Sequence, residues 1–212
     1  MIDEMFEYGR DIMNAKRKDP ADDLLSAIAN AELEGHQLSP EFLDGSWLLI
    51  IFAGNDTTRN TLSGAIKLLT ENPEQKQKLI DNPELMPNFL QECIRMISPV
   101  MHMRRTTMCE TEVGGQKMGP GEKVVMWYGA ANRDPAIFSN PDQFDIERAN
   151  ADKHLAFGIG RHTCIGKPVA LMQLEESYKQ ILTRFPNIHM SGDWKVAPNN
   201  FVHAIQEMPV KF

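Results

Sequence analysis

A long helix in the first half of the chain is the feature of this sequence that most constrains its fold. Ser39 is a good N-cap, Pro40 suits the first helical position, and Glu41 adds a favourable acidic charge to the first turn. A helix is expected to stop before the Asn72-Pro73 pair. The sequence therefore predicts one helix from residue 40 to about residue 70, which makes a mainly helical fold the starting expectation.

Further helices and a smaller β component are predicted around it. Apolar residues at helical spacing predict helices over 1–18, 24–33, 74–80, 87–97 and 166–185. After residue 98, the runs VMHMRRTTM, TEVGG and KVVMWYG favour strands, and two or three short strands are expected to close the chain. Residues 132–166 are predicted to be irregular, and loops this long are usually functional or disordered. The predicted fold class is mainly α with a small β component.

The composition excludes several classes of function. The net charge of −7 over 212 residues is opposite to that of a general nucleic-acid binder. The longest apolar run, residues 47–54, is too short to cross a bilayer, and the first residues are mixed and charged rather than a secretion leader. Cys93, Cys109 and Cys164 lack the spacing of a disulfide framework or a zinc site. We therefore expect a cytoplasmic protein without a membrane span or a nucleic-acid partner.

The stretch HLAFGIGRHTCIGKP, residues 154–168, surrounds Cys164 with glycines and basic side chains. Cys164 lies just before the helix predicted to start near Gly166, where the positive end of a helix favours a thiolate over a thiol. The glycines let main-chain N–H groups approach the sulfur closely. Such a thiolate suits a metal ligand, or a nucleophile with His162 as its base. A buried, inert cysteine beside a helix end is the alternative.

Three further patterns are weak when each is taken alone. In AGNDTT, residues 53–58, small residues allow something bulky and flat to lie against the long helix, although the solvated face of an amphipathic helix is the more typical origin. In ECIR, Glu92 and Arg95 stand three residues apart, which alone indicates an ordinary surface ion pair. A basic set can cradle anionic groups or simply line a polar strand edge and a solvated loop. The members of this set are Arg104, Arg105, His154 and His162.

The order and spacing of these patterns carry more information than any one of them. AGNDTT is followed by ECIR at 92–95 and by FGIGRHTCIG at 157–166, with SPVMHMRRT, NRDP and FDIER between the last two. A sequence with these motifs in this order resembles the cytochrome P450 family over essentially the whole chain from about Asp22. The resemblance implies the carboxy-terminal portion of the P450 fold, with its long central helix, ExxR helix, meander, cysteine loop and final helix. Because complete members are much longer, it also implies a single, incomplete P450 domain over 1–212.

The resemblance assigns roles to individual residues. Cys164 would be the proximal thiolate ligand of a heme iron, whose electron donation favours O–O cleavage. Asp56 and Thr57 would be catalytic, by delivering protons during oxygen activation. The other residues implied in heme binding are Ala53, Gly54, Arg105, His154, Phe157, Gly158, His162 and Gly166. Those implied in bracing the structure are Glu92, Arg95 and Arg148. Those implied in the substrate pocket are Leu49, Ile50, Val100, Met101, Met103, Phe201 and Val202.

The implied activity is a heme-thiolate monooxygenase that inserts one oxygen atom from O₂ into an apolar substrate. AGNDTTRN, MRRT and KVVMWYGAANRDP look closest to soluble bacterial hydroxylases of alkanes and fatty acids, and KRKDPADDLLSAI resembles those of steroid side chains. An alkane, a fatty acid or a sterol-like molecule is therefore the expected substrate. The alternative is a non-catalytic heme-binding fragment of such an enzyme, because the chain alone would leave apolar pocket surface uncovered. A cysteine hydrolase would leave AGNDTT and ECIR unexplained.

The resemblance also implies an electron-transfer partner. Electrons would come from NAD(P)H through a ferredoxin or flavodoxin-type donor and its reductase. Basic residues cluster around the cysteine loop in the sequence, and we expect them to form a docking patch for an acidic donor. This patch would consist of Arg148, Lys153, Arg161 and Lys167.

Overall fold

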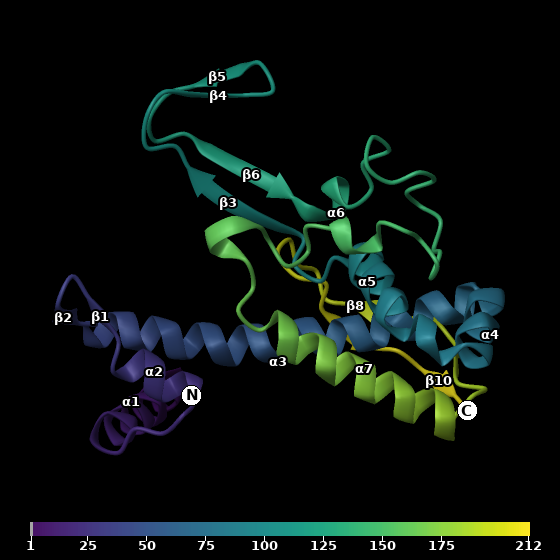
Figure 1. The fold of residues 1–212 in the computed structure, drawn as a ribbon, viewed down its shortest axis with the longest axis horizontal. Helices are drawn as coiled ribbons and strands as arrows, with labels where there is room; N and C mark the ends of the chain where they lie inside the picture. The colour runs from purple at the N-terminus through teal and green to yellow at the C-terminus, as the bar shows by residue number, and fades with distance from the viewer. Residues whose placement is uncertain (1) are drawn as a thin grey trace. The chain divides into compact units, whose positions relative to one another are not determined.

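The computed structural model describes residues 2–212, which form mostly helices together with short antiparallel strand pairs (Figure 1). The expectation of a mainly α fold with a small β component is confirmed. The chain forms two compact units, one up to Asn55 and the other from Asp56 to Phe212. The boundary between them falls within α3 (Pro40–Glu71). A single domain over 1–212 stays a prediction.

The first unit is built around Trp47. It contains α1 (Ile2–Lys18), α2 (Leu24–Ala29), the strands β1 (Glu32–Leu33) and β2 (His36–Gln37), and the first part of α3. Trp47 is buried with Met13 and Ala29, and its indole N–H donates to the main-chain oxygen of Met5 over 3.0 Å. α1 and α3 pack closely here because residue 9 is glycine: a Cβ on Gly9 would lie 2.4 Å from the indole ring.

The long helix predicted from its capping residues is present. The main-chain N–H of Phe42 donates to the hydroxyl oxygen of Ser39 over 3.2 Å, as an N-cap requires. The helix then runs to Glu71, and α4 (Pro73–Asp81) begins with the proline expected to end it. The predicted start and end of this helix are therefore confirmed to within about one residue.

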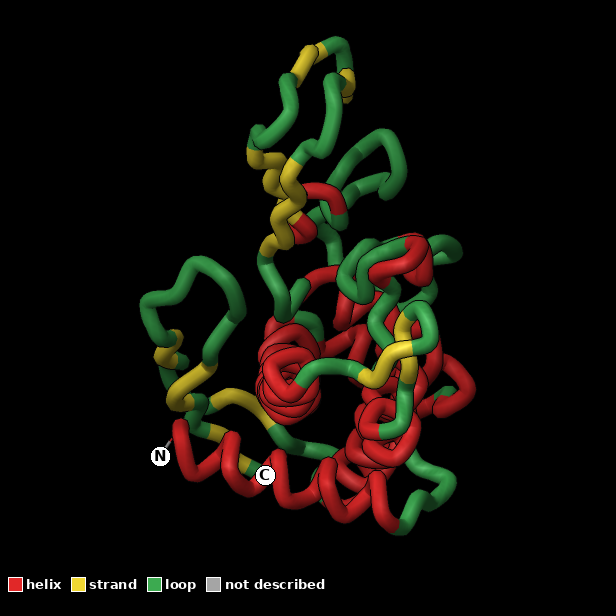
Figure 2. The backbone as a smooth tube through the Cα atoms, turned by 90° about the vertical axis from the view of Figure 1, so that its left-hand side faces the viewer, coloured by secondary structure: helices red, strands yellow, loops and turns green. Residues whose placement is uncertain are grey.

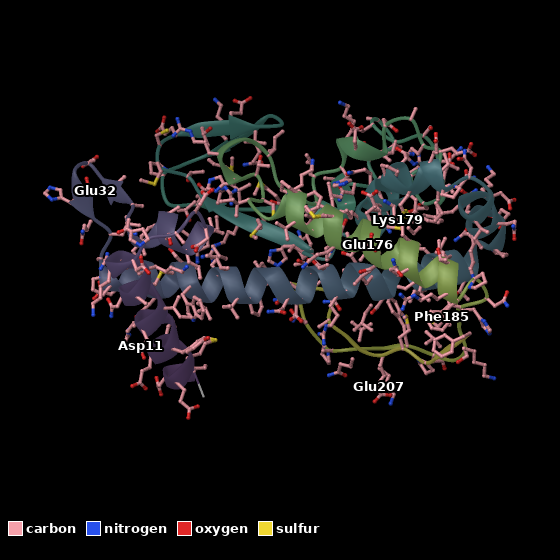
Figure 3. The ribbon with its side chains drawn as sticks, turned by 60° about the horizontal axis from the view of Figure 1, so that its bottom comes forward. Asp11, Glu32, Glu176, Lys179, Phe185 and Glu207 are labelled. Atoms are coloured by element: carbon pink, nitrogen blue, oxygen red, sulfur yellow. The ribbon has the colours of Figure 1, made fainter. Side chains whose placement is uncertain are left out.

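α4, α5 (Met86–Ile97) and α7 (Lys167–Arg184) contribute to the main core of the second unit, together with the second part of α3. The ring of Phe89 on α5 is fully buried and meets the ring of Tyr178 on α7 edge-on, at 5.1 Å between centres. The hydroxyl of Tyr178 donates to the main-chain oxygen of Leu62 in α3 over 2.6 Å, so burial leaves its polar end satisfied. Glu176 and Lys179 lie on the exposed side of α7 (Figure 3).

The strands of the second unit form two-stranded antiparallel sheets rather than one continuous sheet. β3 (His102–Thr106) pairs with β6 (Lys123–Trp127), and β4 (Thr111–Val113) pairs with β5 (Gln116–Met118). Figure 2 shows these two pairs following each other along one arm of the unit. Near the end of the chain, β7 (His189–Met190) pairs with β10 (Val210–Lys211), and β8 (Lys195–Val196) pairs with β9 (Ile205–Glu207).

Three sequence predictions differ from the structure in detail. The helix predicted over 24–33 ends at Ala29, because Glu34 and Gly35 adopt left-handed φ angles of 54° and 79° and turn the chain into the β1–β2 hairpin. The run KVVMWYG is a strand only to Trp127, after which α6 (Tyr128–Ala131) forms a single helical turn. Four short strands, rather than two or three, close the part of the chain that the structure describes.

Residues 132–166 are irregular, as predicted, apart from two short 3-10 turns, η2 (Ala151–Lys153) and η3 (Gly160–His162). A further 3-10 turn, η1 (Pro83–Leu85), connects α4 to α5. Within residues 2–212, none of the helices combines the length and the apolar character that crossing a membrane requires.

Candidate functional site

Three charged side chains are buried together where α5 meets the irregular segment after α6. Glu92 and Arg95 are 0% exposed, and Arg148 is 6% exposed. The Oε2 atom of Glu92 accepts from Nε of Arg95 over 2.7 Å, and Oε1 accepts from Nη2 of Arg95 over 2.8 Å and from Nε of Arg148 over 3.0 Å. The surface ion pair that ECIR indicates when taken alone is therefore wrong, since the pair lies in the core and has a third member.

Main-chain carbonyl groups satisfy the rest of the two guanidinium groups. Arg95 Nη1 donates to the main-chain oxygens of Asn132 and Pro141, each over 2.8 Å. Arg148 donates to three more carbonyl oxygens within residues 139–143, over 2.6, 3.2 and 2.8 Å. These bonds hold a segment without regular secondary structure against α5. They also correct one prediction: Arg148 belongs to this cluster and is not available to an exposed docking patch.

The loop that carries Cys164 turns at two glycines. Gly158 and Gly160 have φ angles of 69° and 65°, in the left-handed region that glycine adopts without strain. A Cβ on Gly158 would lie 2.8 Å from the main-chain oxygen of His162, so the position also lacks space for a side chain. The main-chain N–H of Cys164 donates to the main-chain oxygen of Phe157 over 2.8 Å and closes the loop.

Cys164 lies on the surface, directly before α7. It forms no disulfide, and Gly166 is the N-cap of the helix that follows. The neighbouring apolar side chains of Ile159 and Ile165 are 74% and 76% exposed. The buried, inert cysteine considered from the sequence is therefore wrong. An accessible sulfur between exposed apolar side chains suits a flat, apolar ligand that covers the loop and binds the sulfur.

Two of the basic residues near this loop lie where an anionic edge of such a ligand can be bound. Arg105, on β3, lines a cavity of about 270 Å³ that Gly158 and Ile159 of the cysteine loop also line. His162 is exposed at the end of η3. Arg104 is exposed on β3, and its main-chain oxygen accepts from Nη1 of Arg105 over 3.0 Å.

His154 occupies a different environment from the other basic residues. Its ring is buried, Nε2 lies 3.1 Å from Oε1 of Gln91, and Nδ1 accepts from the main-chain N–H of Ala156 over 3.2 Å. Burial of the ring, with the positive charge of Lys167 as a smaller cause, lowers the pKa of His154 to about 4. A neutral imidazole with both nitrogens engaged is a poor ligand for a carboxylate, so the interpretation of His154 as a residue that binds an anionic edge is corrected.

The polar group in the middle of α3 includes an ion pair. Nη2 of Arg59 donates to Oδ1 of Asp56 over 2.9 Å, and both side chains are partly exposed. The main-chain oxygen of Thr57 accepts from the hydroxyl of Thr61, one turn further on, over 2.8 Å. A Cβ on Gly54 would meet nothing within 4 Å, so packing within the protein does not require glycine there.

The structure brings together four of the five substrate-pocket residues predicted after residue 98. Val100 forms a β-bridge with Val202, and the main-chain N–H of Met101 donates to the main-chain oxygen of Phe201 over 2.8 Å. Met103 follows on β3. Sequence reasoning passed over His102, whose ring lies 5.9 Å from that of Phe201 and 4.7 Å from that of Trp127. His102 lies between Met101 and Met103 in the sequence, and this position between two predicted pocket residues could have identified it as a further candidate.

The side chains at this site fit a metal ion that is already bound by most of its ligands within a cofactor. Among residues 2–212, three or more His, Cys, Asp or Glu side chains do not gather in any place where they could hold a metal ion. Cys164 therefore offers a single sulfur next to exposed apolar side chains, and Arg105 lines a cavity that other residues of the same loop also line. A metal held in a flat macrocycle with acidic substituents matches this set, because it needs one axial ligand, apolar contacts and cations for its edge.

A comparison with known protein families decides the assignment. A family model described as "Cytochrome P450" matches residues 1–209. The chain belongs to the cytochrome P450 family. Members bind heme through a cysteine thiolate, so heme is the cofactor of the family, and the resemblance read from the three motifs is confirmed.

Individual P450 relatives are similar over nearly the whole chain. It is 35% identical to "Linalool 8-monooxygenase" of Pseudomonas putida, over 99% of this chain and 52% of that protein. It is 37% identical to a "Steroid C26-monooxygenase" of Mycobacterium tuberculosis (strain ATCC 25618 / H37Rv), over 97% of this chain and 52% of that one. The chain therefore spans about half the length of the curated P450 relatives it matches.

Solved structures give the same result for the fold. A cytochrome P450-153 from Novosphingobium aromaticivorans matches with a TM-score of 0.90 and 38% identity, over 99% of this chain and 52% of that one. A Mycobacterium marinum cytochrome P450, CYP268A2 in complex with pseudoionone, matches with a TM-score of 0.92 and 37% identity, over 99% of this chain and 50% of that one. The P450 fold is therefore shown for the portion that this chain represents.

Proposed function

We propose that the protein acts as a heme-thiolate monooxygenase and that Cys164 would bind the heme iron. The observation that carries the proposal is the loop itself: it turns at Gly158 and Gly160, exposes Cys164, and lines a cavity together with Arg105 through Gly158 and Ile159. Heme, when bound, supplies activation of O₂ and insertion of one oxygen atom into the substrate. The relatives named as monooxygenases support this class of activity.

The residues of the loop would hold the heme in three ways. Cys164, which lies just before the N-cap of α7, would bind the iron through its sulfur. Phe157 would pack beside the heme, and Nζ of Lys167 lies 5.4 Å from the centre of its ring. Arg105 would bind a propionate by charge, and His162 would bind one by hydrogen bonding. Gly158 and Gly166 would let the loop approach the heme, and the resemblance adds Ala53 and Gly54, which would leave room for oxygen.

The proton path and the bracing role complete the proposed site. Asp56 would take up protons from solvent and pass them to Thr57, because its carboxylate is partly exposed; its ion pair with Arg59 would orient the carboxylate. Glu92, with Arg95 and Arg148, would brace the segment that precedes the cysteine loop in the sequence. That role needs burial and complete hydrogen bonding, and the cluster has both.

An apolar molecule is the substrate class we propose, with an alkane, a fatty acid or a sterol-like molecule as its candidates. Apolar residues gather where the chain leaves α5 and where it turns near its end, and this supports an apolar pocket wall. The names of two relatives point the same way, to a monoterpene alcohol and to steroids. The proposed lining residues are Leu49, Ile50, Val100, Met101, Met103, Phe201 and Val202.

A ferredoxin or flavodoxin-type protein, with its NAD(P)H-dependent reductase, is the proposed electron donor. Lys153 and Arg161 are exposed and Lys167 is partly exposed, so they remain candidates for a basic docking patch after Arg148 is removed from it. A cytoplasmic location belongs to the same proposal, because such donors and free thiols are found there.

One spectrum tests the proposal. After reduction and addition of carbon monoxide, the protein should show the strongly red-shifted Soret band of thiolate-ligated heme. Cys164→Ser should abolish this band, whereas Cys109→Ser, at the other exposed cysteine of residues 2–212, should leave it unchanged. Absence of the band in the wild-type protein, or its survival in Cys164→Ser, would overturn the proposal. A band without product from O₂, electrons and apolar substrates would instead favour the non-catalytic heme-binding fragment.

A further inference from the structure

Asn132 is a buried amide that joins the charged cluster to the start of the cysteine loop. It is 0% exposed and opens the irregular segment that follows α6. Its main-chain oxygen accepts from Nη1 of Arg95 over 2.8 Å, and its side-chain Nδ2 donates to the hydroxyl oxygen of Ser98 over 2.8 Å. Its side-chain Oδ1 accepts from the main-chain N–H of Leu155 over 2.6 Å. Three separate segments therefore meet at one side chain and its own carbonyl group.

On the α5 side, the bonds close into a ring. The hydroxyl of Ser98 donates to the main-chain oxygen of Arg95 over 2.9 Å while accepting from Asn132, so Arg95, Ser98 and Asn132 are linked pairwise. Ser98 is 1% exposed and has a φ angle of 45°, a left-handed conformation that is unfavourable for a residue other than glycine. The ring holds the end of α5 in this conformation, so Asn132 is anchored to a part of the structure with little freedom.

On the other side, Leu155 is two hydrogen bonds away from the cysteine. The main-chain oxygen of Leu155 accepts from the N–H of Gly158 over 2.8 Å, which sets the first glycine turn. The main-chain oxygen of Phe157 accepts from the N–H of Cys164 over 2.8 Å, which sets the second half of the loop. Within the loop these bonds are local, so they fix its shape but not its place relative to α5. The bond from Leu155 to Asn132 supplies a constraint of that second kind, and the contact between the ring of His154 and Gln91 of α5 supplies another, one residue earlier.

We propose that Asn132 is a positioning residue for Cys164: through Leu155, its side-chain oxygen sets where the cysteine loop starts relative to α5. This inference rests on the proposed function, since the sulfur must meet a heme iron at a defined place. Glu92 and the two arginines brace the segment as a whole. Asn132, at the beginning of this segment, forms a side-chain hydrogen bond with the main chain of Leu155, near its end. Among the bonds that the structure describes, it is the one side-chain bond to the main chain of Leu155.

Three variants separate positioning from general stability. Asn132→Ala removes the bonds to both Leu155 and Ser98. Ser98→Ala removes the two ring bonds made by its hydroxyl but leaves Oδ1 of Asn132 and its bond to Leu155, so it is the matched control for lost buried hydrogen bonds. Asn132→Asp keeps an oxygen in the place of Oδ1 and is the conservative rescue.

The first measurement is hydrogen exchange of the Leu155 amide in the protein without heme, relative to the amide of Tyr178 in the core of α7. Asn132→Ala removes the acceptor of the Leu155 amide and leaves this N–H without a partner, which should speed its exchange by roughly tenfold or more. The relative rate should stay within about twofold of wild type in Ser98→Ala and Asn132→Asp, because both keep the acceptor. Equal relative rates in Asn132→Ala and Ser98→Ala would overturn the inference.

The second measurement is the fraction of the reduced carbon monoxide complex that shows the red-shifted thiolate band. It should fall in Asn132→Ala and be retained in Ser98→Ala and Asn132→Asp. An unchanged thiolate fraction in Asn132→Ala would overturn the positioning role even if the Leu155 amide were released. A wild-type protein without the band would defeat the proposed function, and the positioning role toward heme with it. In that case the amide exchange alone would still report whether Asn132 holds Leu155.

Discussion

Replacing Glu92 with glutamine tests how much the buried charged cluster contributes to the stability of the second unit. The carboxylate accepts hydrogen bonds from three guanidinium N–H groups and from the main-chain N–H of Asp145 over 3.1 Å. Glutamine has nearly the same size, but it carries no charge and replaces one acceptor oxygen with an NH₂ group. Arg95 and Arg148 would then remain buried without a counter-ion, and one donor would face another.

The expected cost follows from this geometry. Removing one partner of a buried ion pair costs about 3–5 kcal/mol, because the other charge stays out of water. The remaining amide oxygen and the carbonyl groups around Arg95 and Arg148 still satisfy some of the N–H groups, so we expect the lower end, about 3 kcal/mol. This is a large share of the roughly 5–15 kcal/mol that stabilises a typical domain. With a denaturant slope of about 3 kcal/mol per molar urea, the unfolding midpoint should fall by roughly 1 M.

The assay is equilibrium unfolding in urea, followed by far-ultraviolet circular dichroism. Glu147→Gln is the matched control, because Glu147 pairs with Lys78 at the surface, where both side chains are about half exposed. The control should change the midpoint little, since exposed ion pairs contribute little. A midpoint for Glu92→Gln that stays close to that of Glu147→Gln would refute the reasoning, because it would mean that water or relaxation compensates the two buried arginines.

Three further predictions concern other sites. Gly158→Ala should lower heme affinity and should lower stability by about 2 kcal/mol or more, because its Cβ would meet the carbonyl oxygen of His162. The control is Gly114→Ala, since Gly114 has a φ angle of 57° but open space around it. In thermal unfolding this control should show only the conformational strain of about 1–2 kcal/mol. Burial lowers the pKa of His154 to about 4, below the usual value of about 6.5. As the pH falls, this histidine therefore takes up a proton in the unfolded chain before it does so in the folded protein. Stability should therefore be full above about pH 6.5 and decline towards pH 4 by up to roughly 3 kcal/mol, and His154→Gln should flatten that part of a pH series of urea midpoints. Tyr178→Phe should cost about 1 kcal/mol in urea unfolding, because the hydrogen bond from its hydroxyl to the main-chain oxygen of Leu62 in α3 is lost. A flat pH series in the wild-type protein, or no cost in Tyr178→Phe, would contradict the corresponding argument.

Local signals were sufficient to predict the long helix and the cysteine loop. The start of α3 is determined by Ser39 and Pro40, whose effects act within one turn, and its end by the proline that opens α4. The turn of the cysteine loop depends on glycines that lie within ten residues of Cys164. In both cases the interacting groups are close in sequence, so the sequence pattern contains most of the information.

Partners that are far apart in sequence account for what could not be predicted from the residues alone. Glu92 and Arg95 look like a surface pair because Arg148, which completes their burial, lies 56 positions beyond Glu92. His154 looks like a candidate for an anionic ligand until the structure places Gln91 against its ring. In each case the sequence shows the chemistry of the side chain. The segment that surrounds this side chain in the structure cannot be identified from the sequence pattern near it.

The way in which residues 139–143 are held has a consequence for how this stretch can vary. Arg95 and Arg148 bind it through main-chain oxygen atoms, and four of its five side chains are exposed. Every residue type offers the same carbonyl group, so substitution should be tolerated where the backbone angles are ordinary. Asn140 is the exception, because its φ angle of 46° lies in the left-handed region that glycine and asparagine adopt most readily. An insertion or a deletion would instead shift the carbonyl groups away from the guanidinium groups. Outside Asn140, this stretch is therefore constrained more in its length than in the identity of its side chains, and protein engineers should keep its residue count unchanged.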